Sequence, residues 1–179
     1  LLPFVCYYEN NNFPKQTKLA KELSEYSGFE NVISYPYTIR NDEPAKYVFK
    51  QASQSGKTAL SFESGKLGYV QQESVDRIKR GYYRLFNKLG MYKYKDPKSE
   101  YKFRTLKSPK YLKSDNRGIL YTELKVGDKV IKGQKLGYIT NEFARKIQEF
   151  YSPVSGIILY MLGVPATNID QTVFAISPK

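Results

Sequence analysis

The stretch that decides the fold is an internal repeat, GILYTELKVGDKVIKGQKLGYI at residues 118–139 and GIILYMLGVPATNIDQTVFAI at residues 156–176. Segment 118–121 is similar to segment 156–160, and segment 133–139 is similar to segment 170–176. A repeat this short cannot bury a core alone, so its two copies are expected to pack together. Short apolar runs separated by Gly, Pro and Asp turns are typical of strands. We therefore predict an all-β domain at residues 115–179, formed by two interlocking half-barrels.

The first 92 residues alternate between two kinds of apolar pattern. Strand-like runs lie at residues 3–8, 31–35 and 57–63, and stretches of helical period lie at residues 14–27, 43–55 and 73–89. The inward positions are expected to be Ala45, Val48, Phe49 and Ala52 in the second helix and Val75, Ile78, Tyr82, Leu85 and Leu89 in the third. Alternating strands and helices predict a mostly parallel sheet with crossovers. Residues 93–114 lack a clear period, so we predict a basic join there.

The charge of the chain is concentrated in one segment. The net charge is +12, and residues 77–113 carry thirteen Lys and Arg but only two acidic residues, Asp96 and Glu100. Such a strip attracts anionic partners, and its interleaved tyrosines are a feature of single-strand nucleic-acid binders. No nucleic-acid-binding motif accompanies them, so nucleic acid is not the favoured partner.

The reactive side chains are few. The sequence has no histidine and one cysteine, Cys6, which excludes an internal disulfide and is expected to be a packed core thiol. Histidine is the commonest general base and zinc ligand, so we predict no metal site within this chain.

No apolar run approaches the roughly 20 residues of a membrane span, and LLPFVCYY at the start does not resemble a signal peptide. We expect no membrane partner and favour the cytoplasm. Oligomeric state stays open, a homo-oligomer included. The chain begins on an apolar strand and has no initiator methionine, so we expect it to belong to a longer protein.

VGDKVIKGQKLGYI followed by YSPVSGIIL resembles the lipoyl/biotinyl-like barrel-sandwich module. In carriers of that type a lysine at a hairpin tip takes the prosthetic group. The corresponding turn here, residues 141–146, lacks the carrier motif, and Lys146 is expected to be an ordinary surface residue.

A second resemblance spans residues 56–176: TALSFESG, then a helix ending in LFNKLGM, then the β module. This order resembles the C-terminal part of the succinylglutamate desuccinylase/aspartoacylase family, zinc-dependent amide hydrolases with a carboxypeptidase-like α/β/α fold. The implied fold is α/β followed by all-β, a partial α/β/α sheet at residues 1–92 and a small barrel-sandwich hybrid domain. The family's histidine and glutamate zinc ligands do not occur here, so the resemblance implies that zinc is held by residues outside this chain.

Glu63 matches the family's catalytic glutamate, the general base, and is expected at the C-terminal end of a central strand, where open α/β sheets bind ligands. Substrates of the family carry carboxylates, which arginine binds well. Arg40, in the loop after the 31–35 strand, is a candidate substrate-binding residue on the same side of the sheet as Glu63, with Tyr35 and Tyr37 nearby. No motif of the family supports these three residues.

The resemblance implies part of a hydrolase that acts on a small anionic substrate, an N-acyl amino acid or a related amide. By itself this chain is expected to be inactive. Three alternatives stay open: a non-catalytic scaffold, a basic module that binds an anionic polymer, and an acyl carrier.

Overall fold

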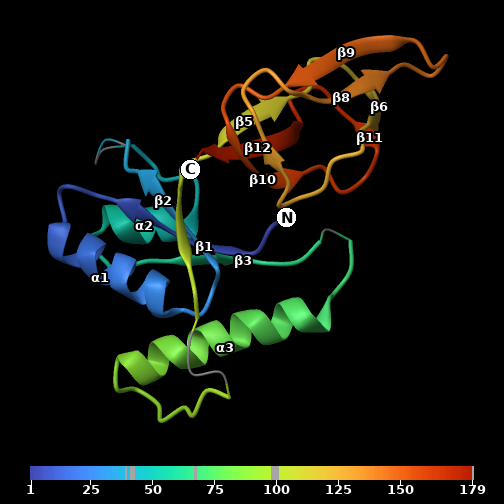
Figure 1. The fold of residues 1–179 in the computed structure, drawn as a ribbon. Coiled ribbons are helices and arrows are strands. Elements are labelled where there is room, and N and C mark those ends of the chain that lie inside the picture. Colours follow the sequence, from blue (N-terminus) through green and yellow to red (C-terminus); the bar gives the residue numbers. More distant parts are fainter. Residues whose placement is uncertain (39, 41–42, 67, 98–100, 179) are drawn as a thin grey trace. The chain divides into compact units, whose positions relative to one another are not determined.

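The computed structural model describes residues 1–38, 40, 43–66, 68–97 and 101–178, and it divides into two compact units. The α/β unit comprises residues 3–108, and the β unit comprises residues 1–2 with 109–179 (Figure 1). The predicted join at residues 93–114 is therefore divided between them. Its two short strands, β4 (Arg104–Lys107) and β5 (Lys110–Lys113), belong to different units. Because lysines occupy exposed positions of these short strands, their alternation of apolar and polar residues is too brief to be recognised in the sequence.

The sheet of the α/β unit has the order β3-β1-β2-β4. Its other strands are β1 (Phe4–Glu9), β2 (Asn31–Pro36) and β3 (Ser61–Glu63). β1, β2 and β4 run parallel, as the alternating pattern predicts. β3, however, runs antiparallel to β1, so the prediction of parallel crossovers is wrong for this strand.

The lengths of the helices account for the direction of β3. α1 (Pro14–Tyr26) has 13 residues, about 20 Å of helix, which matches the length of a six-residue strand. α2 (Val48–Gln54) has only seven residues, about 10 Å. A short helix fits the direction of β3, which starts opposite Cys6 in the middle of β1 and runs back towards Phe4.

Two faces of the sheet are covered by different helices. Val5, Tyr7 and Val32 lie in one cluster with Ala20 of α1 and Ile78 of α3 (Gln72–Lys88). On the opposite face Tyr8 stacks on Phe49 of α2, with ring centroids 4.8 Å apart. The unit is therefore a partial three-layer α/β/α arrangement, as predicted.

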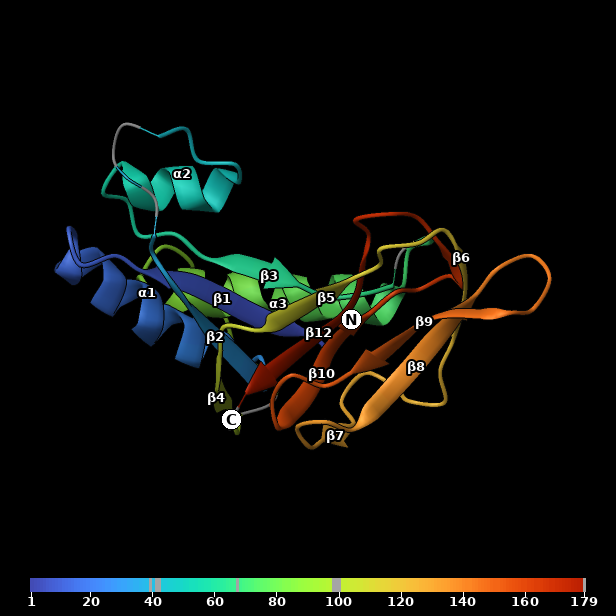
Figure 2. The same ribbon diagram turned by 90° about the horizontal axis from the view of Figure 1, so that it is seen from above.

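The β unit contains two four-stranded sheets, β5-β12-β10-β7 and β11-β6-β8-β9 (Figure 2). The strands are β6 (Gly118–Tyr121), β7 (Lys129–Val130), β8 (Lys135–Thr140), β9 (Lys146–Tyr151), β10 (Gly156–Met161), β11 (Ala166–Thr167) and β12 (Thr172–Pro178). One core holds Leu136 and Ile139 of β8 together with Ile158 of β10 and Phe174 of β12. The two sheets therefore bury a common interior.

The repeat seen in the sequence is a repeat of structure. β6 pairs with β8 in the first half, and β10 pairs with β12 in the second. The short strand of each half crosses to the other sheet, so that β7 pairs with β10 and β11 pairs with β6. Each half therefore contributes a strand to the sheet of the other half, but the described strands form two separate sheets and do not close into a barrel.

Equivalent turns in the two halves also share their geometry. Gly133 has a φ of +82°, and Asp170, its equivalent in the second half, has a φ of +63°. The amide of Gly133 donates to Ser152 O, and the amide of Asp170 donates to Ser114 O, both at 2.8 Å. The two copies therefore keep the same turn although glycine occupies only one of them.

Candidate active site

Glu63 is the last residue of β3 and lies opposite Phe4, the first residue of β1. Ser61 Oγ donates a hydrogen bond to Glu63 Oε1 at 3.2 Å. The Glu63 side chain is half-buried, and Gly65, with a φ of +110°, turns the chain away immediately after it. A carboxylate held in this way is accessible to a ligand and is steadied by one neighbour.

β3 is the outermost strand of its sheet among the residues that the structure describes. The sequence prediction of a central strand is therefore wrong for this chain taken alone. An edge strand leaves the backbone donors and acceptors of one side unpaired. Glu63 therefore lies on the edge strand of the described sheet.

An open groove of about 600 Å³ runs beside Glu63. Its lining comes from the start of α2, the segment that leads into β3 and one position of α3: Tyr47, Val48, Phe49, Ala52, Thr58, Ala59, Leu60, Ser61, Phe62, Glu63 and Tyr82. Most of these side chains are apolar or aromatic, and Glu63 is the one acidic residue among them. Sequence reasoning missed this groove because it expected Val48 and Tyr82 to face inward. The structure leaves them 85% and 48% exposed.

Arg40 and Glu63 lie at opposite ends of the sheet. Arg40 follows the end of β2, which pairs with the end of β1, and its carbonyl accepts a hydrogen bond from Gln54 Nε2 at the end of α2. Glu63 lies where β1 begins. The predicted placement of Arg40 on the same side as Glu63 is wrong, because the reversed direction of β3 carries Glu63 to the other end.

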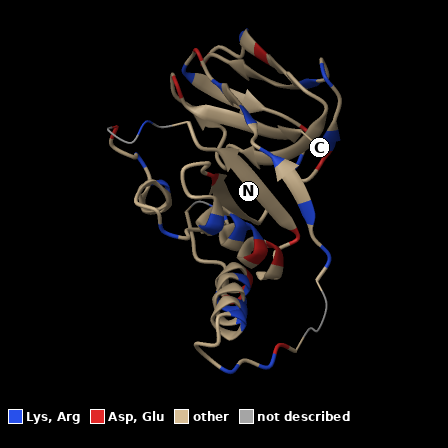
Figure 3. Ribbon diagram, turned by 90° about the vertical axis from the view of Figure 1, so that its left-hand side faces the viewer, with Lys and Arg blue, Asp and Glu red and all other residues tan. Residues whose placement is uncertain are grey.

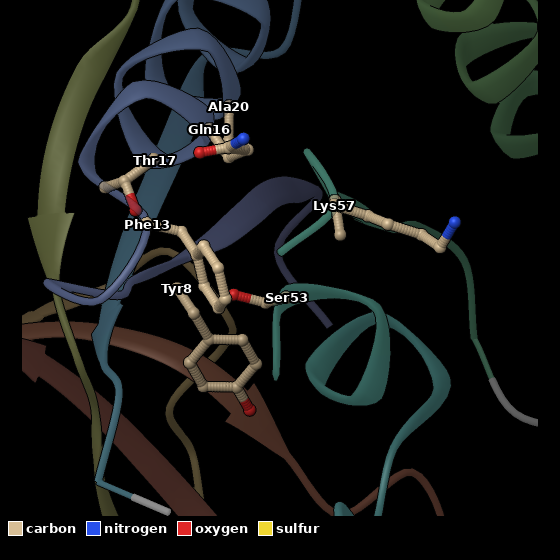
Figure 4. Close-up of a pocket in the computed structure, with 8 residues that line it drawn as sticks. Tyr8, Phe13, Gln16, Thr17, Ala20, Ser53 and Lys57 are labelled. Atoms are coloured by element: carbon tan, nitrogen blue, oxygen red, sulfur yellow. The ribbon is translucent and has the colours of Figure 1, made fainter. Parts of the chain in front are cut away.

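Tyr35 and Tyr37 belong to an aromatic cluster at the Arg40 end of the sheet. Their ring centroids lie 5.8 Å and 5.9 Å from that of Tyr8, and burial raises the pKa of Tyr37. A small notch with no room for a water molecule lies beside Tyr8, between Phe13, Thr17 and Ser53 (Figure 4). This notch is a gap in the packing rather than a ligand site. Tyr35 and Tyr37 do not line the groove beside Glu63.

Cys6 lies in β1, beside β3. It is buried and free, as predicted, and pairs with Ser61 across the two strands. Burial, and after it the charge of Glu63, raise the pKa of the Cys6 thiol to about 12. A thiol that stays protonated at neutral pH is a poor nucleophile and a poor metal ligand.

The described residues do not form a site that fits zinc. They contain no group of three or more Cys, Asp or Glu side chains close enough to hold a metal ion, and the sequence has no histidine. Zinc sites need three or four such ligands. Glu63 and the protonated Cys6 do not make that set.

The basic segment is only partly available to a partner. Lys and Arg recur along α3 and the loop that follows it (Figure 3). Arg84 is buried, however, with its guanidinium between the rings of Tyr26 and Tyr101, at 4.6 Å and 4.3 Å from their centroids, and it forms an ion pair with Asp96. This arginine stabilises the fold and does not contribute to a binding surface.

Lys146, the lysine nearest to the carrier turn, is the first residue of β9. Its Nζ lies 3.1 Å from Glu149 Oε1 and 4.8 Å from the centroid of the Tyr138 ring. An ammonium group engaged in this way on a strand differs from a lysine displayed at a hairpin tip.

In the part of the chain that the structure describes, no helix is long and apolar enough to cross a membrane.

Comparison with solved structures gives one consistent result. A succinylglutamate desuccinylase/aspartoacylase from Rhodobacter sphaeroides superimposes with a TM-score of 0.82 and 16% identity, over 99% of this chain and 54% of its own. The product-bound ectoine utilization protein EutE (DoeB) from Ruegeria pomeroyi gives 0.81 and 14%, over 99% and 54%. An aspartoacylase family protein from Mesorhizobium loti gives 0.73 and 16%, over 99% and 52%.

No family model and no curated protein matches the sequence. At these identities the comparisons establish the fold and leave the chemistry open. The chain spans about half the length of the solved structures that it matches. From end to end, it has the fold of about half of a succinylglutamate desuccinylase/aspartoacylase family protein, as the sequence resemblance predicted.

Proposed function

We propose that this chain is the part of an amide-hydrolysing enzyme that carries the general base, Glu63. The observation that supports this most directly is the position of Glu63, half-buried at the end of β3 beside an open groove. The solved structures of the same fold are named as desuccinylases and aspartoacylases. An N-acyl amino acid or a related small anionic amide is the proposed substrate.

The proposed role of Glu63 is proton transfer. Its carboxylate takes a proton from the water that attacks the amide carbonyl, and it returns that proton to the nitrogen of the leaving amine. Ser61 Oγ donates a hydrogen bond to Oε1, and we assign the proton transfer to Oε2.

Zinc, the metal that the resemblance implies, would polarise the carbonyl and acidify the water if residues outside the described part of this chain held it. The proposal for Glu63 does not depend on a ligand from this chain.

For the β unit, we propose a barrel-sandwich module that serves as an accessory domain and carries no prosthetic group, because Lys146 lies on a strand and is paired with Glu149.

Replacing Glu63 in a complemented protein tests the proposal. The half of the Rhodobacter sphaeroides chain that this chain does not cover is produced separately, mixed with this chain and zinc, and assayed for hydrolysis of N-acyl amino acids. Glu63→Gln is expected to lower kcat by about 10²–10⁴, the usual contribution of a general base.

Arg40→Gln, at the other end of the sheet, is the matched control and is expected to leave kcat unchanged. If a complex forms and hydrolyses the amide equally well with Glu63→Gln, the proposed role of Glu63 is wrong.

A further inference from the structure

One face of α3 (Gln72–Lys88) is aromatic and open to solvent. Lys79, Tyr82, Tyr83 and Phe86 stand at positions i, i+3, i+4 and i+7, so they share one side of the helix. Together they line an open hollow of about 390 Å³, and the three rings are 37% to 48% exposed. Exposed apolar side chains that gather in one patch, unlike scattered ones, indicate an interaction site.

The segment after α3 brings two more rings to this face. The rings of Tyr92 and Tyr94 lie 5.5 Å and 5.4 Å from that of Tyr83, measured between centroids. The Tyr94 amide donates a hydrogen bond to Asn87 Oδ1 at 3.1 Å, and the Tyr92 amide donates to Phe86 O at 3.3 Å. The segment is therefore folded back on the end of the helix. We call these five rings the α3 aromatic face: Tyr82, Tyr83, Phe86, Tyr92 and Tyr94.

The charges beside the α3 aromatic face are positive. Residues 77–95 contain seven Lys and Arg and no Asp or Glu. Three of the seven already contact other side chains of the fold, namely Arg77, Arg84 and Lys88. Four are exposed: Lys79, Arg80, Lys93 and Lys95. Because these charges share one sign, the surface is complementary to a polyanion.

The rings decide between two kinds of polyanion. The face of an aromatic ring is electrostatically negative, so it does not attract the carboxylates of an acidic peptide. A nucleobase, in contrast, has a flat π-face that stacks on aromatic side chains, and single-strand binders combine such rings with basic side chains. Bases within a duplex are stacked on one another, whereas RNA displays unpaired bases in loops, bulges and ends. The surface therefore fits single-stranded RNA best.

We propose that the α3 aromatic face binds single-stranded RNA, with bases stacked on its rings and phosphates held by Lys79, Lys93 and Lys95. The sequence carries no nucleic-acid-binding motif, and interleaved tyrosines alone do not favour this partner. The inference rests on the tertiary placement of five rings on one face, with Arg84 withdrawn into the interior. It goes beyond the proposed function, because it does not involve Glu63.

Fluorescence anisotropy of a labelled uridine oligomer of about 15 nucleotides, titrated with the full chain, tests the proposal. A Kd of about 10 μM or tighter is expected at about 50 mM salt. The slope of log K against log salt should be about −2, because three phosphate contacts each contribute about −0.7 in a single strand.

Tyr83→Ala and Tyr92→Ala should each weaken binding by about 5- to 100-fold, the range found for loss of one stacked base. Tyr121→Ala and Tyr151→Ala are the matched controls. Both remove tyrosines of the β unit that are similarly exposed, 43% and 49%, and should leave the affinity unchanged. Circular dichroism checks that each variant is folded. Tyr92, which is 54% exposed, keeps the test valid if Tyr83→Ala disturbs packing.

The lysines are tested in the same titration. Lys95→Ala should reduce the steepness of the salt dependence by about 0.7, the contribution of one phosphate contact. Lys132→Ala, at an exposed position of the β unit, is the control and should leave the slope unchanged.

Four outcomes overturn the proposal. They are a Kd weaker than about 100 μM at about 50 mM salt, equal binding of a polyglutamate of the same charge, equal binding of a duplex, and tighter binding of a thymidine DNA strand of the same length. Binding that the tyrosine variants and their controls weaken equally also overturns it. None of these results depends on hydrolysis, so the RNA surface and the proposed function fail separately.

Discussion

Gly118 and Gly156 occupy equivalent places in the two halves of the β unit, and both are fixed by close approach of backbone. A Cβ on Gly118 would lie 2.2 Å from Thr140 O, and one on Gly156 would lie 2.1 Å from Ser177 O. Each oxygen belongs to the strand next to the glycine, β8 or β12, and cannot move without breaking that pairing. The sequence echo GIL–GIIL therefore marks a steric requirement as well as a repeat.

Gly156→Ala is expected to lower the free energy of unfolding of the β unit by about 3 kcal/mol, the upper range for overpacking. Urea unfolding followed by circular dichroism measures the change. Gly163→Ala is the control, because nothing lies within 4 Å of its added Cβ; this change should cost less than about 1 kcal/mol. Equal losses in the two variants would contradict the steric explanation.

Cys6 gives a prediction on pH at the same scale. Its pKa rises from the ordinary 9.0 to about 12 in the folded chain, so between these values the unfolded chain binds fewer protons than the folded one. Stability is therefore complete below pH 9 and falls as pH rises towards 12. Tyr7, whose pKa burial raises from 10.0 to about 12, adds to the loss from pH 10 upward.

Cys6→Ala should flatten the part of this dependence that lies between pH 9 and 10, measured as the urea midpoint against pH. Alkylation of the folded chain by iodoacetamide at pH 8 should be slow and should become fast in urea. Rapid alkylation of the folded chain would contradict the buried, protonated thiol.

At the scale of elements, α3 is fastened to its neighbours by Arg84. Its Nε donates to the carbonyl oxygen of Tyr26, the last residue of α1, at 2.7 Å, and its guanidinium pairs with Asp96 in the segment after α3. The side chains of Arg84 and Asp96 are only 9% and 12% exposed. A charge pair this buried holds three segments together but is costly to break.

Asp96→Asn is expected to destabilise the α/β unit by about 3 kcal/mol, because it leaves the Arg84 cation buried without its carboxylate. Thermal and urea unfolding measure the change. Glu73→Gln is the control: Glu73 forms the pair with Arg77 on the same helix but is 80% exposed, and exposed pairs contribute at most about 1 kcal/mol. A loss as small as that of the control would contradict the stabilising role of the Arg84 pair.

At the scale of the whole molecule, the chain has a base at the edge of a sheet and no set of zinc ligands in its described part. The chain alone, supplied with zinc and an N-acyl amino acid, is therefore expected to show no hydrolysis above the rate in buffer. A coupled assay for the released amino acid measures this. Hydrolysis by the chain alone that Glu63→Gln abolishes would contradict the prediction that any zinc ligands lie outside the described part of this chain.

Much of the fold was predictable because local patterns specify it. The spacing of apolar residues located α1 and α3 to within two residues, and the repeat in residues 118–176 predicted that two halves of the β unit pack together. The join at residues 93–114 was not predictable in detail. Strands of four residues with lysines on their exposed positions carry too short an alternation, and assignment of β4 and β5 to different sheets depends on pairing with distant strands.

The candidate site shows the same division. The sequence by itself determined that Glu63 ends a strand and that the chain has no histidine, because strand endings and composition are local properties. Only the tertiary structure decided that β3 runs backwards at the edge of the sheet, which separates Glu63 from Arg40 and exposes Val48 and Tyr82 beside it. Strand direction and exposure arise from contacts between residues far apart in the chain. A local sequence pattern does not specify which side of a helix or strand is covered by distant residues.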